Sequence, residues 1–291
     1  MDKQDVYLQH IRNVAPTLEL HTVRLHTSDG QFNDILIVND ELIFRFPRSF
    51  HAAKALIHEV AILSKIQNTT TLPIPHPIYV RTNSEVAHEN FMGYRMIPGE
   101  PLFNRVLDAI EDNSVLERLA VQIATFLQEL HRIPTKDRGL DLPLSDTHDG
   151  WLHMYQQFRA KLFPYMRPDA CEEVTHNFDL FLNDSRHFAY TPVFRHGDFG
   201  GSNILYDAKT QRITGVIDFS FAGLGDPALD LAAISTCGDP FFQQVRNAYP
   251  ASNILVERAQ FYKSTYALQQ ALYALRDNDR ESFEDGIAQY I

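Results

Sequence analysis

The first third of the chain alternates apolar and polar residues with the two-residue period of strands that are buried on one face. Three segments show this pattern first, at residues 21–27, 34–38 and 41–46. A polar turn at 28–33 joins the first two, and residues 52–66 carry apolar residues at helical spacing. Two more strands are expected before Pro98-Gly99 breaks the chain. The pattern predicts a strand-rich N-terminal lobe at residues 1–97.

Beyond residue 97 the apolar positions recur every three or four residues, as they do on helices that bury one face. Ser114 and Glu117 have the spacing of a capping box, which predicts the start of a long helix there. Asp226 followed by Pro227 predicts the N-cap and first position of another helix. Further helices are expected at residues 151–162, 170–182 and 254–275. The fold class is therefore α+β, with a mainly helical C-terminal lobe at residues 98–291.

The composition is that of an ordinary globular protein. Of 291 residues, 44% are hydrophobic and 22% are charged, which suffices to bury a sizeable core. No run of about 18 apolar residues is present, so we expect no membrane span, and the start of the sequence lacks a signal-peptide pattern. Cys171 and Cys237 have no metal-ligand spacing. A cytoplasmic location is the expectation.

The net charge of −11 lies almost wholly in residues 98–291. A negative field of this kind opposes nucleic-acid binding, which requires a basic surface. It would concentrate a cationic small molecule at a cleft, although acidic helix faces that only keep the protein soluble explain it equally well. We therefore expect a small-molecule partner, with no nucleic acid and no membrane, and a chain that is a monomer or a dimer.

The segment from residue 195 to 219 carries the strongest chemical signal. Asp198 and Asn203 have the D-x-x-x-x-N spacing of a kinase catalytic loop, and Asp218-Phe219 occupies the place of a metal-binding aspartate. Residues 203–206 and 212–217 read as the two strands of a hairpin, which brings Asn203 beside Asp218. Two oxygen ligands side by side suit Mg²⁺, with Asp198 ahead of them to meet a hydroxyl. Each residue alone could simply cap a turn, but together they predict a phosphotransferase.

Arg45 and Glu59 are candidates for binding nucleotide phosphates. Arg45 lies on the third strand and points away from the face of Phe44 and Phe46. It can reach the α- and β-phosphates, and Glu59 on the following helix can hold it through an ion pair. The alternative is an exposed arginine and a solvated glutamate.

These motifs resemble, in order, those of the aminoglycoside phosphotransferase family, the antibiotic kinases that share the bilobal protein-kinase fold. The resemblance covers essentially the full length and is closest to the 2″-type branch. It implies that Asp198 is the catalytic base, and that Asp230 braces the catalytic loop. It also implies Mg²⁺ at Asn203 and Asp218, phosphate binding by Arg45 and Glu59, and contacts to the base of ATP or GTP from Arg95, Met96 and Ile97.

The sequence departs from this family in three places. Arg45 stands where many relatives have lysine, which keeps the charge but changes the geometry. The 2″-type enzymes place acids after the metal aspartate and after the Asp230 helix, whereas here Ser220 follows Asp218-Phe219 and only Asp239 is acidic in the second stretch. We expect an acceptor pocket walled by three residues of the C-terminal lobe: Asp239, Tyr262 and Tyr266.

Three functions compete on this evidence. The leading hypothesis is a kinase that transfers the γ-phosphate of ATP or GTP to a hydroxyl of an aminoglycoside antibiotic. The alternative keeps the chemistry but takes a macrolide or another hydroxylated metabolite. A pseudokinase scaffold that binds nucleotide is a third, and only the missing third-strand lysine supports it. Protein-kinase activity is disfavoured, because no Ala-Pro-Glu segment fits between Asp218 and Asp226.

Overall fold

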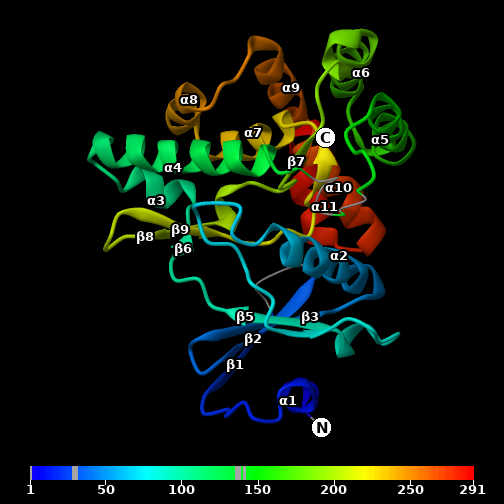
Figure 1. Ribbon diagram of the computed structural model, residues 1–291. Helices are drawn as coiled ribbons and strands as arrows, with labels where there is room; N and C mark the ends of the chain where they lie inside the picture. Colours follow the sequence, from blue (N-terminus) through cyan, green and yellow to red (C-terminus); the bar gives the residue numbers. More distant parts are fainter. Residues whose placement is uncertain (1, 28–31, 135–138, 140–141) are drawn as a thin grey trace.

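The computed structural model describes residues 2–27, 32–134, 139 and 142–291, which form a smaller and a larger lobe (Figure 1). In the described part of the smaller lobe, five strands pair antiparallel in the order β1-β2-β3-β5-β4. The strands are β1 (Val23–His26), β2 (Asn33–Val38), β3 (Leu42–Pro47), β4 (Tyr79–Arg81) and β5 (Phe91–Arg95). Two helices, α1 (Lys3–Val14) and α2 (Phe50–Ile66), cover opposite faces of this sheet.

Alternation along β3 decides which side chains meet each helix. Phe44 and Phe46 are fully buried in a cluster with Tyr7 of α1, and Tyr7 stacks on Phe46 at 4.0 Å between ring centroids. Gly93 of β5 lies opposite Phe44, where a Cβ atom would approach the Phe44 ring to 2.5 Å. Arg45 therefore emerges on the other face, towards α2.

A buried carboxylate fixes α1 to the sheet. Asp34 of β2 is fully buried, and it accepts hydrogen bonds from the Tyr7 hydroxyl at 2.5 Å and from Arg48 Nε at 2.8 Å. Lys3 Nζ lies 2.6 Å from the same carboxylate. Burial alone would raise the pKa of Asp34, but these three donors outweigh it and lower the pKa below its ordinary value.

The larger lobe is mainly helical. Its helices are α3 (Asn104–Asp108), α4 (Asn113–His131), α5 (His148–Lys161), α6 (Pro168–Asn183), α7 (Ala228–Ile234), α8 (Asp239–Ala248), α9 (Asn253–Ser264), α10 (Tyr266–Asp277) and α11 (Arg280–Ile287). Its short strands are β6 (Glu100–Pro101), β7 (Val193–Arg195), β8 (Ile204–Asp207), β9 (Arg212–Val216) and β10 (Gly223–Gly225). None of the helices in the described part of the chain is long and apolar enough to cross a membrane.

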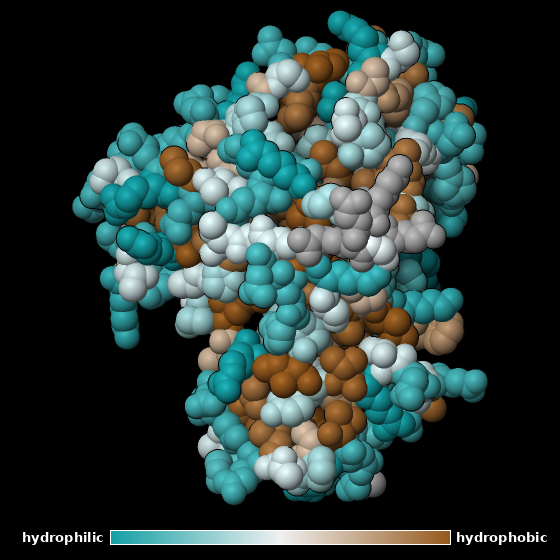
Figure 2. Space-filling view, viewed as in Figure 1, coloured by the Kyte–Doolittle hydropathy of each residue, from teal (hydrophilic) through white to brown (hydrophobic). Residues whose placement is uncertain are grey.

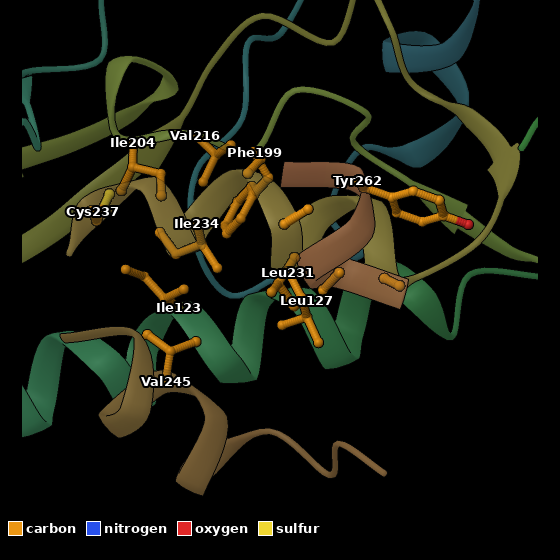
Figure 3. Close-up of a cluster of buried hydrophobic side chains, with 14 of the residues drawn as sticks. Ile123, Leu127, Phe199, Ile204, Val216, Leu231, Ile234, Cys237, Val245 and Tyr262 are labelled. Carbon is orange, nitrogen blue, oxygen red and sulfur yellow. The ribbon is translucent and has the colours of Figure 1, made fainter. Parts of the chain in front are cut away.

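The core of the larger lobe lies beneath the segment that carries the kinase motif. Figure 3 shows Leu127 of α4 directed towards Leu231 of α7, with Phe199 beside them. All three side chains are fully buried, and Phe199 stacks on Phe126 at 5.5 Å between centroids. Because Phe199 follows Asp198 directly, the core fixes the backbone of the catalytic loop.

Hydrophobic residues also reach the surface of the smaller lobe beside its sheet (Figure 2).

Most predicted elements are confirmed, and three helix predictions are wrong. Pro227, not Asp226, is the N-cap of α7, which begins at Ala228, although Asp226 Oδ1 still accepts from Ala228 N at 2.9 Å. The cap of α4 is Asp112, whose carboxylate accepts from Ser114 N, so Ser114 lies inside the helix and forms no capping box. The predicted helix over 254–275 is two helices that meet at Thr265. The Thr265 N–H and hydroxyl both donate to Tyr262 O, a tight turn that ends α9. Residues 28–31 of the predicted turn lie outside the described residues.

Asp34→Asn should lower the free energy of unfolding by about 2–3 kcal/mol at pH 7, the cost of losing hydrogen bonds to a buried charged group. Because folding depresses the pKa of Asp34, its stabilisation is present above the ordinary aspartate pKa of about 3.9 and is lost as the pH falls through the folded value. The stabilities of the variant and wild type in urea should therefore differ fully above about pH 4 and converge only as the pH falls through the depressed folded pKa of Asp34.

The matched control is Asp40→Asn, which removes an exposed aspartate paired with Arg24 on the same sheet. That variant should cost less than about 1 kcal/mol. A loss at Asp34 as small as this, or one that does not change with pH, would contradict a role for the buried carboxylate.

Candidate active site

The β8–β9 hairpin brings the predicted metal ligands together. Ile204 pairs with Val216, and Ile217 N donates to Asn203 O at 2.9 Å, so Asp218 follows directly at the base of the hairpin. Asp218 has a φ of 63°, a left-handed conformation that costs energy for any residue other than glycine. Such an outlier is typical of residues that have a functional role.

Asn203 also contacts the catalytic-loop aspartate. Its Nδ2 donates to Asp198 O at 2.8 Å and to Asp198 Oδ2 at 2.9 Å. These two donations orient the amide, so that Asn203 Oδ1 has no hydrogen-bond partner among the described residues. Asn203 thus contacts Asp198 through its amide nitrogen, which leaves its Oδ1 available for a cation.

His196 ties the catalytic loop to the end of β9. Its Nδ1 accepts from Asp198 N at 3.3 Å, and its Nε2 lies 3.0 Å from Ile217 O. Since a carbonyl only accepts, Nε2 donates to Ile217 O, while Nδ1 is the acceptor for Asp198 N. His196 thus fixes Asp198 relative to the strand that precedes Asp218.

Asp230 of α7 holds the same loop from the other side. Its carboxylate accepts from His196 N at 2.9 Å, from Gly197 N at 2.8 Å and from His131 Nε2 at 3.0 Å. Burial would raise the pKa of Asp230, but the His131 hydrogen bond and the other donors keep it below its ordinary value. Gly197 has a φ of 86°, and a Cβ atom there would lie 2.2 Å from Phe221 O. The geometry is that of a brace for the loop.

Arg45 and Glu59 form the predicted ion pair. Arg45 Nη1 lies 2.7 and 2.9 Å from the two Glu59 oxygens, and Arg45 Nη2 lies 3.2 Å from Asp218 Oδ1. Burial would lower the pKa of Arg45, but Asp218 and Glu59 outweigh it and raise the pKa. For Asp218, burial raises the pKa, but Arg45 together with the hydrogen bonds from Ser220 and other nearby groups outweighs it, so the pKa falls below its ordinary value. For Glu59, burial raises the pKa, and the nearby Arg45 only partly offsets this.

Asp198 faces the main cleft of the molecule. The cleft encloses about 1380 Å³ between the lobes. Its walls come from Phe32 and Arg48 of the smaller lobe, and from Tyr266, Tyr273 and Asp279 in the C-terminal helices. The side chain of Asp198 is exposed to this space. Its pKa is nevertheless raised, first because the surrounding protein excludes part of the water and second because Asp218 is nearby. A second hollow of about 550 Å³ adjoins Asp198 on the side of α3.

Two of the three predicted acceptor residues do not line either hollow. Tyr262 is fully buried, because it stacks on Trp151 and its hydroxyl donates to Asp226 at 2.8 Å. Asp239 begins α8 in solvent, 3.9 Å from Lys263. Their predicted place in the pocket wall is wrong. Tyr266 lines both hollows, as predicted.

Sequence reasoning missed the α10–α11 junction as part of the cleft. Asp277 and Asp279 line it, separated by Asn278, which ends α10 with a φ of 55°. The Asp-Asn-Asp run is a turn signal that marks this break, but nothing in it indicates which side faces the cleft. The sequence likewise carries no signal that Phe32 and Arg48 of the smaller lobe face the cleft.

A two-lobed fold with an aspartate, an asparagine and a second aspartate in this arrangement defines a kinase-like phosphotransferase. The chain belongs to the phosphotransferase enzyme family, whose model matches residues 14–262. It is 31% identical over 272 residues to viomycin phosphotransferase of Streptomyces vinaceus, covering 91% of this chain and 92% of that protein. The family predicted from the motifs is confirmed.

Solved structures confirm the predicted fold. The complex of an aminoglycoside 2″-phosphotransferase IIIa with GDP and kanamycin matches with a TM-score of 0.89 at 24% identity, over 98% of this chain and 96% of that one. A macrolide 2′-phosphotransferase type I matches with a TM-score of 0.76 at 21% identity, over 100% of this chain and 98% of that one.

Asp230→Asn should reduce the free energy of unfolding by about 3 kcal/mol, because the amide NH₂ would face backbone N–H groups that need acceptors. The reference variant is Asp207→Asn in the exposed β8–β9 turn, where the aspartate accepts from Lys209 N and Thr210 Oγ1; it should cost less than about 1 kcal/mol. Calorimetric unfolding of both variants checks this. Equal losses would mean that Asp230 does not brace the loop.

Proposed function

We propose that this protein is a small-molecule kinase that transfers the γ-phosphate of ATP or GTP to a hydroxyl of an antibiotic of the aminoglycoside or viomycin type. The observation that carries the proposal is that Asn203 contacts Asp198, which lines the cleft, and also pairs with the residue that precedes Asp218. Family membership and the likeness to viomycin phosphotransferase support the antibiotic acceptor. In this proposal residues 1–97 bind the nucleotide, and residues 98–291 supply the catalytic loop and the acceptor site.

The nucleotide would lie between β5 and the β8–β9 hairpin. Arg95 ends β5, Met96 and Ile97 follow it, and Met96 N already donates to Glu41 O at 2.7 Å. The backbone groups of Arg95 and Ile97 are therefore the candidates for hydrogen bonds to the base. Arg45, held by Glu59, would neutralise charge on the phosphates.

Mg²⁺ fits the oxygen atoms that the hairpin presents. Asn203 Oδ1 and Asp218 Oδ2 have no hydrogen-bond partner among the described residues, and both are the hard oxygen donors that Mg²⁺ prefers. Mg²⁺ at such sites is usually held by one or two protein ligands together with phosphates and water. Bound there, the ion would neutralise charge on the transferring phosphoryl group.

Asp198 would orient the acceptor hydroxyl and accept its proton. Its raised pKa makes it a stronger base than an ordinary aspartate, and its Oδ2 is fixed by Asn203. His196 Nδ1 accepts from the Asp198 backbone N–H, and Asp230 accepts from the backbone of the two preceding residues. The residues of this chain thus align the base before any ligand arrives, which is how positioning lowers the barrier of phosphoryl transfer.

A cationic acceptor would find limited free negative charge in the cleft. Asp146 is paired with Arg195 at 2.6 Å, and Asp277 with Arg276 at 2.8 Å. Asp279 forms no ion pair with any described residue and caps α11 through Ser282. The aromatic walls at Tyr266, Tyr273 and Phe221 favour a second candidate, a macrolide, and the fold shared with a macrolide phosphotransferase supports it.

The test is turnover of ATP and of GTP with viomycin, kanamycin and a macrolide as separate acceptors, read by mass spectrometry of the product. Addition of one phosphoryl group to viomycin or kanamycin supports the leading proposal, and addition to the macrolide alone supports the second. Nucleotide binding without transfer to any acceptor would favour the scaffold hypothesis.

Asp198→Asn should lower kcat by about 10²–10⁴-fold, the usual contribution of a general base, while nucleotide affinity stays near that of wild type. The amide can still contact Asn203, but it cannot accept the hydroxyl proton. Steady-state kinetics and calorimetric nucleotide titration separate the two effects. Turnover close to wild type would remove Asp198 from its proposed role.

Asp279→Asn should raise KM for viomycin or kanamycin several-fold at low salt with little change in kcat, because it removes uniform binding of a cation. Asparagine also caps helices, so the α11 start should survive. Asp239→Asn is the matched control, since Asp239 begins α8 but does not line the cleft. Equal effects on KM at both positions would argue for a general field over a specific contact.

A further inference from the structure

Ser220 places a hydroxyl among the three charged groups of the phosphate site. Its Oγ lies 2.6 Å from Asp218 Oδ1, 3.2 Å from Glu59 Oε2 and 3.3 Å from Arg45 Nη2. Ser220 is half-buried and two residues beyond Asp218, so the contact closes a local turn. Nothing in the motifs of the sequence assigns a role to this side chain.

The direction of the hydrogen bonds follows from proton counting. Arginine only donates, so the Arg45 contact makes Ser220 Oγ an acceptor. The hydroxyl has one proton to donate. Its Oγ lies 2.6 Å from Asp218 Oδ1 and 3.2 Å from Glu59 Oε2, so Asp218 is the closer acceptor. Ser220 therefore receives a hydrogen bond from Arg45 and donates one to Asp218.

The two oxygens of Asp218 consequently have different surroundings. Oδ1 accepts from Ser220 Oγ at 2.6 Å, from Arg45 Nη2 at 3.2 Å and from Ser220 N at 3.3 Å. Oδ2 has no hydrogen-bond partner among the described residues. With Oδ1 held in this way, rotation of the carboxylate is restrained and Oδ2 is the oxygen that remains for a cation.

We propose that Ser220 is a positioning residue, whose hydroxyl acts with Arg45 to hold Asp218 Oδ1 so that Oδ2 is presented to the divalent cation. The inference rests on the proposed nucleotide–metal site and specifies how this chain builds it. Asp218 has a strained left-handed backbone, and such a conformation persists only where surrounding contacts hold it in place. The hydrogen bonds from Ser220 and Arg45 are contacts of this kind.

The proposed role of Ser220 depends on an arginine at position 45, because Arg45 contacts both Ser220 and Asp218. Arg45 Nη1 is occupied by both Glu59 oxygens, and Nη2 serves Asp218 and Ser220. A lysine has a single nitrogen and cannot make this fork. The two departures noted in the sequence, at positions 45 and 220, are thus parts of one hydrogen-bonded unit and should be energetically coupled.

The first arm of the test measures Mn²⁺ binding by electron paramagnetic resonance and calorimetry, in the presence of ADP and of GDP, without acceptor. Ser220→Ala should weaken Mn²⁺ affinity about tenfold, the factor expected for one hydrogen bond to a charged group. Ser220→Thr retains the hydroxyl and should restore the affinity. Ser64→Ala, which removes a hydroxyl bonded to Val60 O on α2, should leave it unchanged.

The second arm is a double-mutant cycle in the metal-free, nucleotide-free protein. Urea unfolding of wild type, Arg45→Lys, Ser220→Ala and the double variant should reveal non-additivity between positions 45 and 220. A merely structural serine would alter stability but leave Mn²⁺ affinity unchanged. Unchanged Mn²⁺ affinity in Ser220→Ala, or additive effects in the cycle, overturns the proposal.

The two arms separate this inference from the proposed function. Failure of the wild type to bind ADP or GDP would overturn the kinase assignment, and the metal-free cycle would still decide whether Arg45 and Ser220 form a unit. Normal Mn²⁺–nucleotide binding in Ser220→Ala together with active wild-type turnover would overturn only the role of Ser220.

Discussion

The buried ion pair between Arg45 and Glu59 is the contact on which the site depends. Removing two charges from water costs several kcal/mol per ion, and the pair is tolerable only because further hydrogen bonds satisfy it. Glu59 Oε1 also accepts from Phe219 N at 3.0 Å, and Arg45 reaches Asp218. The cost of burial is thus offset by bonds that join β3, α2 and the Asp218–Phe219 segment. One electrostatic unit thereby connects the two lobes, and loss of either partner would leave an unpaired buried charge.

The catalytic loop is held from both sides by groups that do not touch a ligand. Asp230 accepts from the backbone of His196 and Gly197, while the His196 ring bridges Asp198 N and Ile217 O. The apolar core beneath Phe199 completes the support. Because phosphoryl transfer depends on alignment more than on covalent chemistry by the protein, this rigidity is a large part of what the fold contributes to the reaction.

The acceptor cleft has a different character. Its walls combine the smaller lobe with the α10–α11 junction, and much of its charge is already neutralised by internal pairs such as Asp146 with Arg195. The high negative charge of the C-terminal residues therefore does not concentrate at the floor of the cleft. Under the proposed function, Asp279 and Tyr266 are candidates for selecting between cationic and apolar acceptors, because both line the cleft.

The sequence by itself determined what depends on local periodicity. Two-residue alternation placed Arg45 opposite Phe44 and towards Glu59, and the hairpin spacing placed Asn203 beside Asp218. Only the tertiary structure decided what depends on distant partners. Tyr262 does not line the cleft, because it is buried between Trp151, on which it stacks, and Asp226, to which its hydroxyl donates. The Ser220 contact required an arginine 175 residues away. The spacing of residues within one element determines the direction in which a side chain points. Its partner is determined by packing between segments that are far apart in the sequence, and the sequence pattern does not indicate which segments will meet.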